Sequence, residues 1–96
     1  MRINLTRPIQ AHGEELLVLE FREPNGDDIA KHGLPFSFAS DGAFTPLMKA
    51  VNGYTADLAG IPPSSVKTIA PADWVTITGA VSSFFQPGGP PAQATP

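Results

Sequence analysis

The sequence predicts an α+β protein in which an N-terminal antiparallel β-hairpin packs on a small bundle of three to four helices. Apolar and polar residues alternate near the N-terminus, which is typical of half-buried strands. Beyond residue 45 the apolar residues recur every three or four positions, which indicates helices. We expect residues 1–86 to form a single domain. Residues 87–96, rich in Pro and Gly, should form a disordered tail because they offer no large apolar side chain to bury.

The two strands of the hairpin are predicted at residues 2–7 and 15–22, with Pro8 ending the first. The alternation places one apolar set toward the helices: Ile3, Leu5, Leu17, Leu19 and Phe21. Leu16 and Val18 then point to the opposite face. Two alternatives are open for that face. It is either covered by a helix or loop, or it is exposed for another protein, because an isolated hairpin is marginally stable.

Helix-end signals and apolar spacing predict helices at residues 26–32, 46–59, 63–69 and 71–85. In the last of them, Trp74 begins an apolar stripe that continues through Ile77, Val81, Phe84 and Phe85. We therefore expect Trp74 to be largely buried and to organise the core. In residues 34–45 the alternation of Leu34, Phe36 and Phe38 is compatible with a short strand, whereas Pro35 and the Ser, Asp and Gly residues favour a loop. We expect an ordered loop whose Phe residues dock on that core.

Composition excludes several classes of function. The net charge is −3, no basic run occurs, and the helix expected at 71–85 has no Lys or Arg, so we expect no binding of nucleic acid. No apolar run approaches the roughly 20 residues of a membrane span. The chain has no Cys, two His without a nucleophile partner, and no phosphate-binding loop, so we expect no catalytic residues, cofactor or metal. Only 16% of residues are charged, against roughly 25% in an average domain, which favours a surface that meets another protein, with a simply inert surface as the alternative.

A series of short segments in a fixed order resembles the tail assembly chaperones of long-tailed phages, of the Mu-like type. The resemblance covers about residues 3–86 and is poorest at 34–45. It is carried by LTRPI (5–9), AHGEE (11–15), LEFREP (19–24), GDD (26–28), LAGIPPS (58–64) and ADW (72–74).

The resemblance implies a non-enzymatic phage or prophage protein that binds the tape-measure protein and assists tail-tube subunits in assembling around it. It also implies a location in the host bacterial cytoplasm and absence from the mature virion. Self-association is left open. The alternative function is a small phage or bacterial regulatory domain that binds a transcription factor or DNA. An enzyme ranks last.

The expected partner-binding residues lie on two surfaces. The outward face of the hairpin offers Leu16 and Val18 together with Ile9, and the end of the last helix offers Phe84 and Phe85. The alternative for all five is burial in the core.

Overall fold

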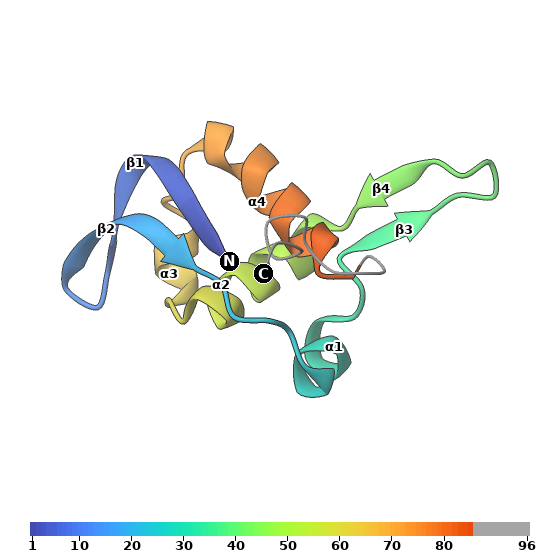
Figure 1. The fold of residues 1–96 in the computed structure, drawn as a ribbon, viewed down its shortest axis with the longest axis horizontal. Coiled ribbons are helices and arrows are strands. Elements are labelled where there is room, and N and C mark those ends of the chain that lie inside the picture. Colours follow the sequence, from blue (N-terminus) through green and yellow to red (C-terminus); the bar gives the residue numbers. More distant parts are fainter. Residues whose placement is uncertain (86–96) are drawn as a thin grey trace, which may run out of the picture.

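The computed structural model describes residues 1–85, so the disordered tail expected at 87–96 lies outside the described residues. The chain forms an N-terminal hairpin, a short helix, a second hairpin and three further helices (Figure 1). This confirms the predicted α+β class. The elements are β1 (Arg2–Ala11), β2 (Glu14–Glu20), α1 (Gly26–His32), β3 (Phe36–Phe38), β4 (Phe44–Pro46), α2 (Met48–Ala59), α3 (Pro63–Val66) and α4 (Pro71–Ser83).

The first hairpin is longer than predicted, because β1 continues past Pro8 to Ala11. His12 and Gly13, with φ values of 55° and 76°, form the tight turn into β2. Positive φ at both central positions is typical of a two-residue hairpin turn. Asn4 pairs with Val18 and Ile9 pairs with Leu16, so the intervening part of β1 bulges out of the ladder. Pro8, which has no N–H to donate, lies in this bulge.

The bulge shifts which side chains of β2 face inward. Ile3 lies opposite Leu19 and Ile9 lies opposite Leu16, so the inward positions of β2 are three residues apart instead of two. Leu16 is consequently half-buried against the core, although it was predicted to point outward. Leu17 was predicted to point inward and is 52% exposed. The simple alternation was wrong at these two positions because it assumed an uninterrupted ladder.

Asp73, in the first turn of α4, supplies the hydrogen bonds that the interrupted ladder lacks. Both of its carboxylate oxygens accept from the backbone N–H of Thr6, at 3.0 Å each, and Oδ2 also accepts from Thr6 Oγ1 at 3.1 Å. Asp73 is 3% exposed. A buried carboxylate near the N-terminus of a helix is also stabilised by the helix dipole. The same side chain therefore ties β1 to α4 and favours the start of α4.

The core lies between the first hairpin and helices α2 and α4. Tyr54 and Val51 from α2 are fully buried in it, with Ile77 and Val81 from α4. Trp74 is half-buried and packs against the edge of this cluster, so it is less buried than predicted. Tyr54 fills the central place, and its hydroxyl donates to the carbonyl of Gly33 at 2.5 Å.

Helix α1 has the predicted bounds, and polar contacts hold it to the rest of the chain. Its N-terminus is closed by a capping box between Asn25 and Asp28, and Arg22 donates to both carboxylate oxygens of Asp28, at 2.7 and 3.0 Å. At the other end, His32 Nε2 lies 2.6 Å from Asp57 Oδ2 on α2. The His32 ring sits so close to Gly53 that a Cβ there would lie 2.4 Å from Nδ1. This contact explains a glycine in the middle of α2.

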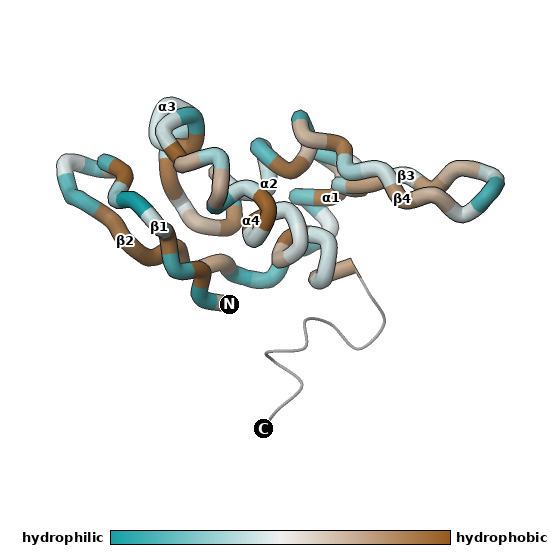
Figure 2. The backbone as a smooth tube through the Cα atoms, turned by 90° about the horizontal axis from the view of Figure 1, so that it is seen from above, coloured by the Kyte–Doolittle hydropathy of each residue, from teal (hydrophilic) through white to brown (hydrophobic). Residues whose placement is uncertain are grey.

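Residues 34–45 are not the predicted loop docked on the core. They contain β3 and most of β4, which form a two-stranded antiparallel hairpin that projects beyond the helices (Figures 1 and 2). Its turn is closed by a hydrogen bond from Ala39 N–H to the Ala43 carbonyl at 2.8 Å, and Gly42 has a positive φ of 88°. Because Pro46 belongs to β4, helix α2 begins at Met48 instead of residue 46.

The last two helices are shorter than predicted. Helix α3 ends at Val66, because Thr68 and Ile69 donate to carbonyls three residues back and tighten the chain before Pro71. Helix α4 ends at Ser83, and Phe84 and Phe85 follow it in a turn.

Candidate protein-binding surface

The second hairpin presents one apolar face. The pairs Phe36–Pro46 and Phe38–Phe44 lie directly opposite each other across the hairpin, and Ser37 and Thr45 form the pair between them. Because side chains alternate along a strand, the first two pairs share one face and the polar pair takes the other. We call Phe36, Phe38, Phe44 and Pro46 the aromatic face. Phe38 is 65% exposed and Phe44 is 45% exposed, which is unusual for side chains of this size.

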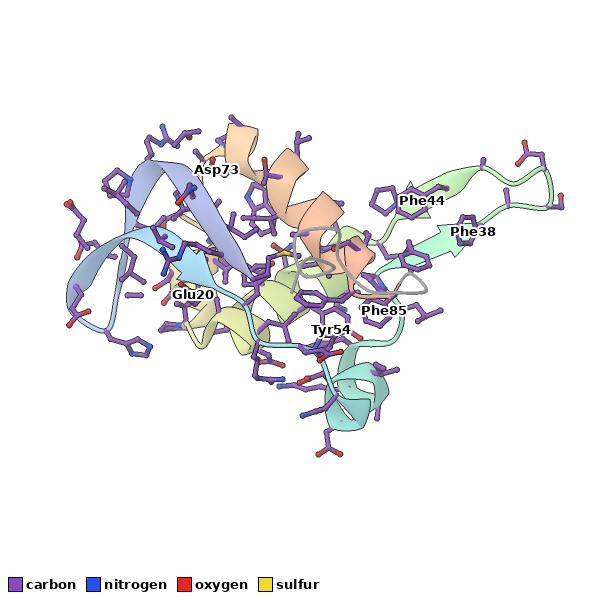
Figure 3. All side chains as sticks on the ribbon, in the orientation of Figure 1. Glu20, Phe38, Phe44, Tyr54, Asp73 and Phe85 are labelled. Atoms are coloured by element: carbon purple, nitrogen blue, oxygen red, sulfur yellow. The ribbon has the colours of Figure 1, made fainter. Side chains whose placement is uncertain are left out.

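The aromatic face is connected to the core by a chain of ring contacts. The three rings of the hairpin have centroids 5.3 to 5.7 Å apart. Phe36 contacts Phe85 edge to face at 6.2 Å, and Phe85 contacts the buried Tyr54 at 5.5 Å. Figure 3 shows Phe85 between the base of the hairpin and Tyr54. Aromatic pairs at these distances are favourable, so the hairpin is held at its base while its outer rings meet solvent.

A shallow apolar hollow continues this surface onto the helices. It has a volume of about 370 Å³ and is lined by Pro46, Met48, Trp74, Val75 and Thr78. Pro46 belongs to both features, so the aromatic face and the hollow are contiguous. Val75 is 79% exposed and Met48 is 42% exposed, and the lining contains no ionisable side chain. Flexible Met and aromatic side chains of this kind suit the capture of an apolar partner.

A smaller exposed apolar site lies on β2. Leu17 is 52% exposed and Val18 is 36% exposed. Charged residues surround them on the same hairpin, including Arg2 and Glu20, whose side chains form an exposed ion pair at 2.7 Å. This site is therefore smaller and more polar in its surroundings than the aromatic face with its hollow.

The structure does not bring the five expected binding residues together. Ile9 is 2% exposed and lies inside the core, so it cannot contribute to an accessible surface. Leu16, Phe84 and Phe85 are half-buried and pack against the core, and Val18 is exposed. Whether the four accessible residues contact a partner stays a prediction. The aromatic face was missed, although the alternation of Phe36 and Phe38 followed by Phe44 was its visible signal in the sequence.

Two ionisable groups outside this surface, Asp57 and Tyr54, have structural partners. The side chain of His32, together with Lys31, holds the pKa of Asp57 below its usual value, and burial raises the pKa of the Tyr54 hydroxyl. Among residues 1–85, no three or more His, Asp or Glu side chains gather as metal ligands. In the same part of the chain no helix combines the length and the apolar character that crossing a membrane requires.

Comparison with known proteins gives a family for nearly the whole chain. Residues 2–86 match the model of the family described as "Phage tail assembly chaperone proteins, E, or 41 or 14". The matched range includes both hairpins and all four helices of the described residues. Searches of curated proteins and of solved structures found no match.

Proposed function

This chain belongs to the phage tail assembly chaperones, and we propose that it binds an apolar helical segment of the tape-measure protein while tail-tube subunits assemble around that protein. The proposal includes action in the cytoplasm of the host bacterium and release before the virion is complete. It assigns no catalytic step to the protein. The single observation that carries the choice of binding surface is the exposed aromatic face, with the hollow beside it.

The shape of the surface supports a helical client. The hollow lies between the base of the second hairpin and the outer side of α4, with Pro46 on the hairpin side and Trp74 and Val75 on the helix side. An amphipathic helix laid along such a groove buries apolar side chains at intervals of three and four residues. The absence of ionisable residues from the lining means that a client would desolvate no charge on this side.

The exposed rings supply the contact energy in this proposal. Phe38 and Phe44 are exposed in the free protein and would lose that exposure on binding. Large aromatic side chains at the centre of an interface commonly contribute about 2 kcal/mol or more each, which is roughly 30-fold in affinity. A weaker contribution of Leu17 and Val18 to the binding free energy would mean that the interface extends to β2.

The test compares two matched double variants in binding to purified tape-measure protein. F38D combined with F44D replaces two exposed apolar side chains of the aromatic face by carboxylates. L17D combined with V18D makes the same change in charge on the other exposed site. We expect the first variant to lose about 30-fold or more in affinity and the second to bind within about threefold of the wild type.

Each outcome addresses a different part of the proposal. The melting temperature of each variant is measured first, since the rings of the hairpin also contact one another. If L17D/V18D loses binding and F38D/F44D retains it, the client binds at β2 and not at the aromatic face. Absence of binding by the wild-type chain eliminates the proposed client, and recovery of the protein in purified virions eliminates release before completion.

A further inference from the structure

We propose that two copies of this chain pair through the outer edge of β3, forming a symmetric dimer with a continuous four-stranded sheet. The occupant of the edge is a second copy of the same chain, and the pairing does not depend on the tape-measure protein. The argument rests on the hydrogen-bond pattern of the hairpin, its lack of charge and its symmetry.

The hydrogen-bond pattern shows which groups of β3 point away from β4. Leu47 N–H donates to the Pro35 carbonyl and Ala39 N–H to the Ala43 carbonyl, both at 2.8 Å, with Ser37 paired to Thr45 between them. In an antiparallel ladder the alternate residues direct their backbone groups outward. The N–H and carbonyl groups of Phe36 and Phe38 therefore face outward, and none of the hydrogen bonds found within residues 1–85 outside the β3–β4 ladder involves them.

The other edge of the hairpin is less suited to pairing. On β4 the outward positions are Phe44 and Pro46, and Pro46 has no N–H to donate. One missing donor in a strand of three residues removes half of the donors at that edge. The β3 edge is therefore the one able to accept another strand, and pairing there closes at two copies instead of continuing into a fibre.

The β3 edge also lacks the charges that normally prevent strands of different molecules from pairing. Neither β3 nor β4 contains a charged residue, and Asp41 lies in the loop between them. The first hairpin, in contrast, is lined with charges at Arg2, Glu14, Glu15 and Glu20. Charged residues on an edge strand are the usual protection against association. The same molecule thus protects one hairpin and leaves the other open.

Two-fold symmetry makes the edge complementary to itself. When two β3 strands run antiparallel about an axis through Ser37, Phe36 of each copy lies opposite Phe38 of the other. All four outward N–H groups then meet outward carbonyls. The two Ser37 side chains face each other on the axis, as a pair without backbone hydrogen bonds. A hairpin of two strands is marginal alone, whereas the resulting sheet has four strands and joins the two aromatic faces.

The test is the oligomeric state of the full chain by sedimentation velocity at rising concentration. Ser37 is exposed in the monomer, so S37K should leave the fold intact and place two ammonium groups against each other in the dimer. We expect dimer affinity to fall about fivefold or more. T45K adds the same charge to the same polar face one strand further from the axis, and should dimerise nearly as the wild type does.

Charge complementation gives the most specific readout. S37K and S37E should each dimerise weakly alone and form a mixed dimer when combined, because opposite charges then meet on the axis. Since the chain has no Cys, S37C should also form a disulfide-linked dimer on oxidation, whereas T45C should not. A wild type that stays monomeric at millimolar concentration overturns the proposal. Equal effects of S37K and T45K, or failure of the mixed pair to associate, overturn the assigned edge.

Discussion

Replacement of Asp73 by alanine is the sharpest test of how the first hairpin is held to the helices. The substitution removes the acceptor of three hydrogen bonds from Thr6, of which two come from one backbone N–H. It leaves that N–H without its acceptor at the point where β1 leaves the ladder. It also removes a negative charge from the first turn of α4.

The expected cost follows from these contacts. A hydrogen bond to a charged group contributes about 1.5 to 3 kcal/mol, and a favourable charge at a helix N-terminus contributes about 0.3 to 1 kcal/mol. Thr6 itself lies at the surface, so water can reach its freed N–H after the carboxylate is gone. We therefore expect D73A to lower the free energy of unfolding by about 2 to 3 kcal/mol, the lower part of the sum.

Urea unfolding followed by circular dichroism measures this loss, with an unchanged m-value as the sign that only stability has changed. D27A is the matched control, because Asp27 lies in the first turn of α1, is exposed and has no such acceptor role. We expect D27A to cost no more than about 1 kcal/mol. If D73A costs no more than D27A, the hydrogen bonds from Thr6 to Asp73 do not stabilise the bulge. The interaction of Asp73 with the helix dipole would then account for the whole effect.

Two further changes test the contacts of α1. G53A should destabilise the protein by about 1 to 3 kcal/mol, because its Cβ would collide with the ring of His32. The control is G79A in α4, where the added Cβ meets no atom within 4 Å and should stabilise the protein by about 0.5 to 1 kcal/mol. If urea unfolding shows that G53A stabilises the protein, the close contact with His32 is contradicted. The hydrogen bonds from Arg22, and next from a backbone N–H, lower the pKa of Asp28 from 3.8 to about 2. Because the pKa of Asp28 is lower in the folded state than in the unfolded state, ionised Asp28 stabilises the fold. This contribution to the free energy of unfolding is complete above pH 3.8 and is lost as the pH falls toward 2. Acid titration should therefore show a shallower loss of stability for D28N than for the wild type, and identical slopes would argue against the ion pair.

The helical part of the fold was predictable because its signals are local. Asn25 and Gly33 mark the ends of α1, and both residues cap it in the structure. Gly60 ends α2 in a left-handed conformation, as glycine at that position predicts. Pro71 begins α4 for a similar local reason, since its missing N–H is no loss in the first turn.

The first hairpin was only partly predictable because its bulge depends on a distant residue. The alternation of Ile3 and Leu5 gave the correct inward face at the start of β1. The ladder is interrupted between Asn4 and Ile9, and within this interruption Thr6 N–H donates to Asp73, a contact across 67 positions that a local pattern does not reveal. The positions of Leu16 and Leu17 were exchanged for that reason.

The candidate site was missed for a different reason. Phe36, Phe38 and Phe44 were expected to dock on the core from an ordered loop, because Pro35 and the Ser, Asp and Gly residues around them favour a loop over a strand. Each strand of their hairpin has only three residues, a length at which alternation hardly differs from chance. The exposure of these rings therefore depends on how the hairpin is placed against the helices, which the sequence pattern of the strands does not show.

The contact between Thr6 and Asp73 also bears on the order in which the chain can fold during synthesis. It joins residues 67 positions apart, so β1 receives these hydrogen bonds from a helix near the end of the match to the family. A nascent chain that stops before α4 has a hairpin with an open bulge and no complete core. Long-range contacts of this kind slow folding, because loop closure must come before the contacts that reward it. The first hairpin would thus acquire all of its native hydrogen bonds only after α4 has been synthesised.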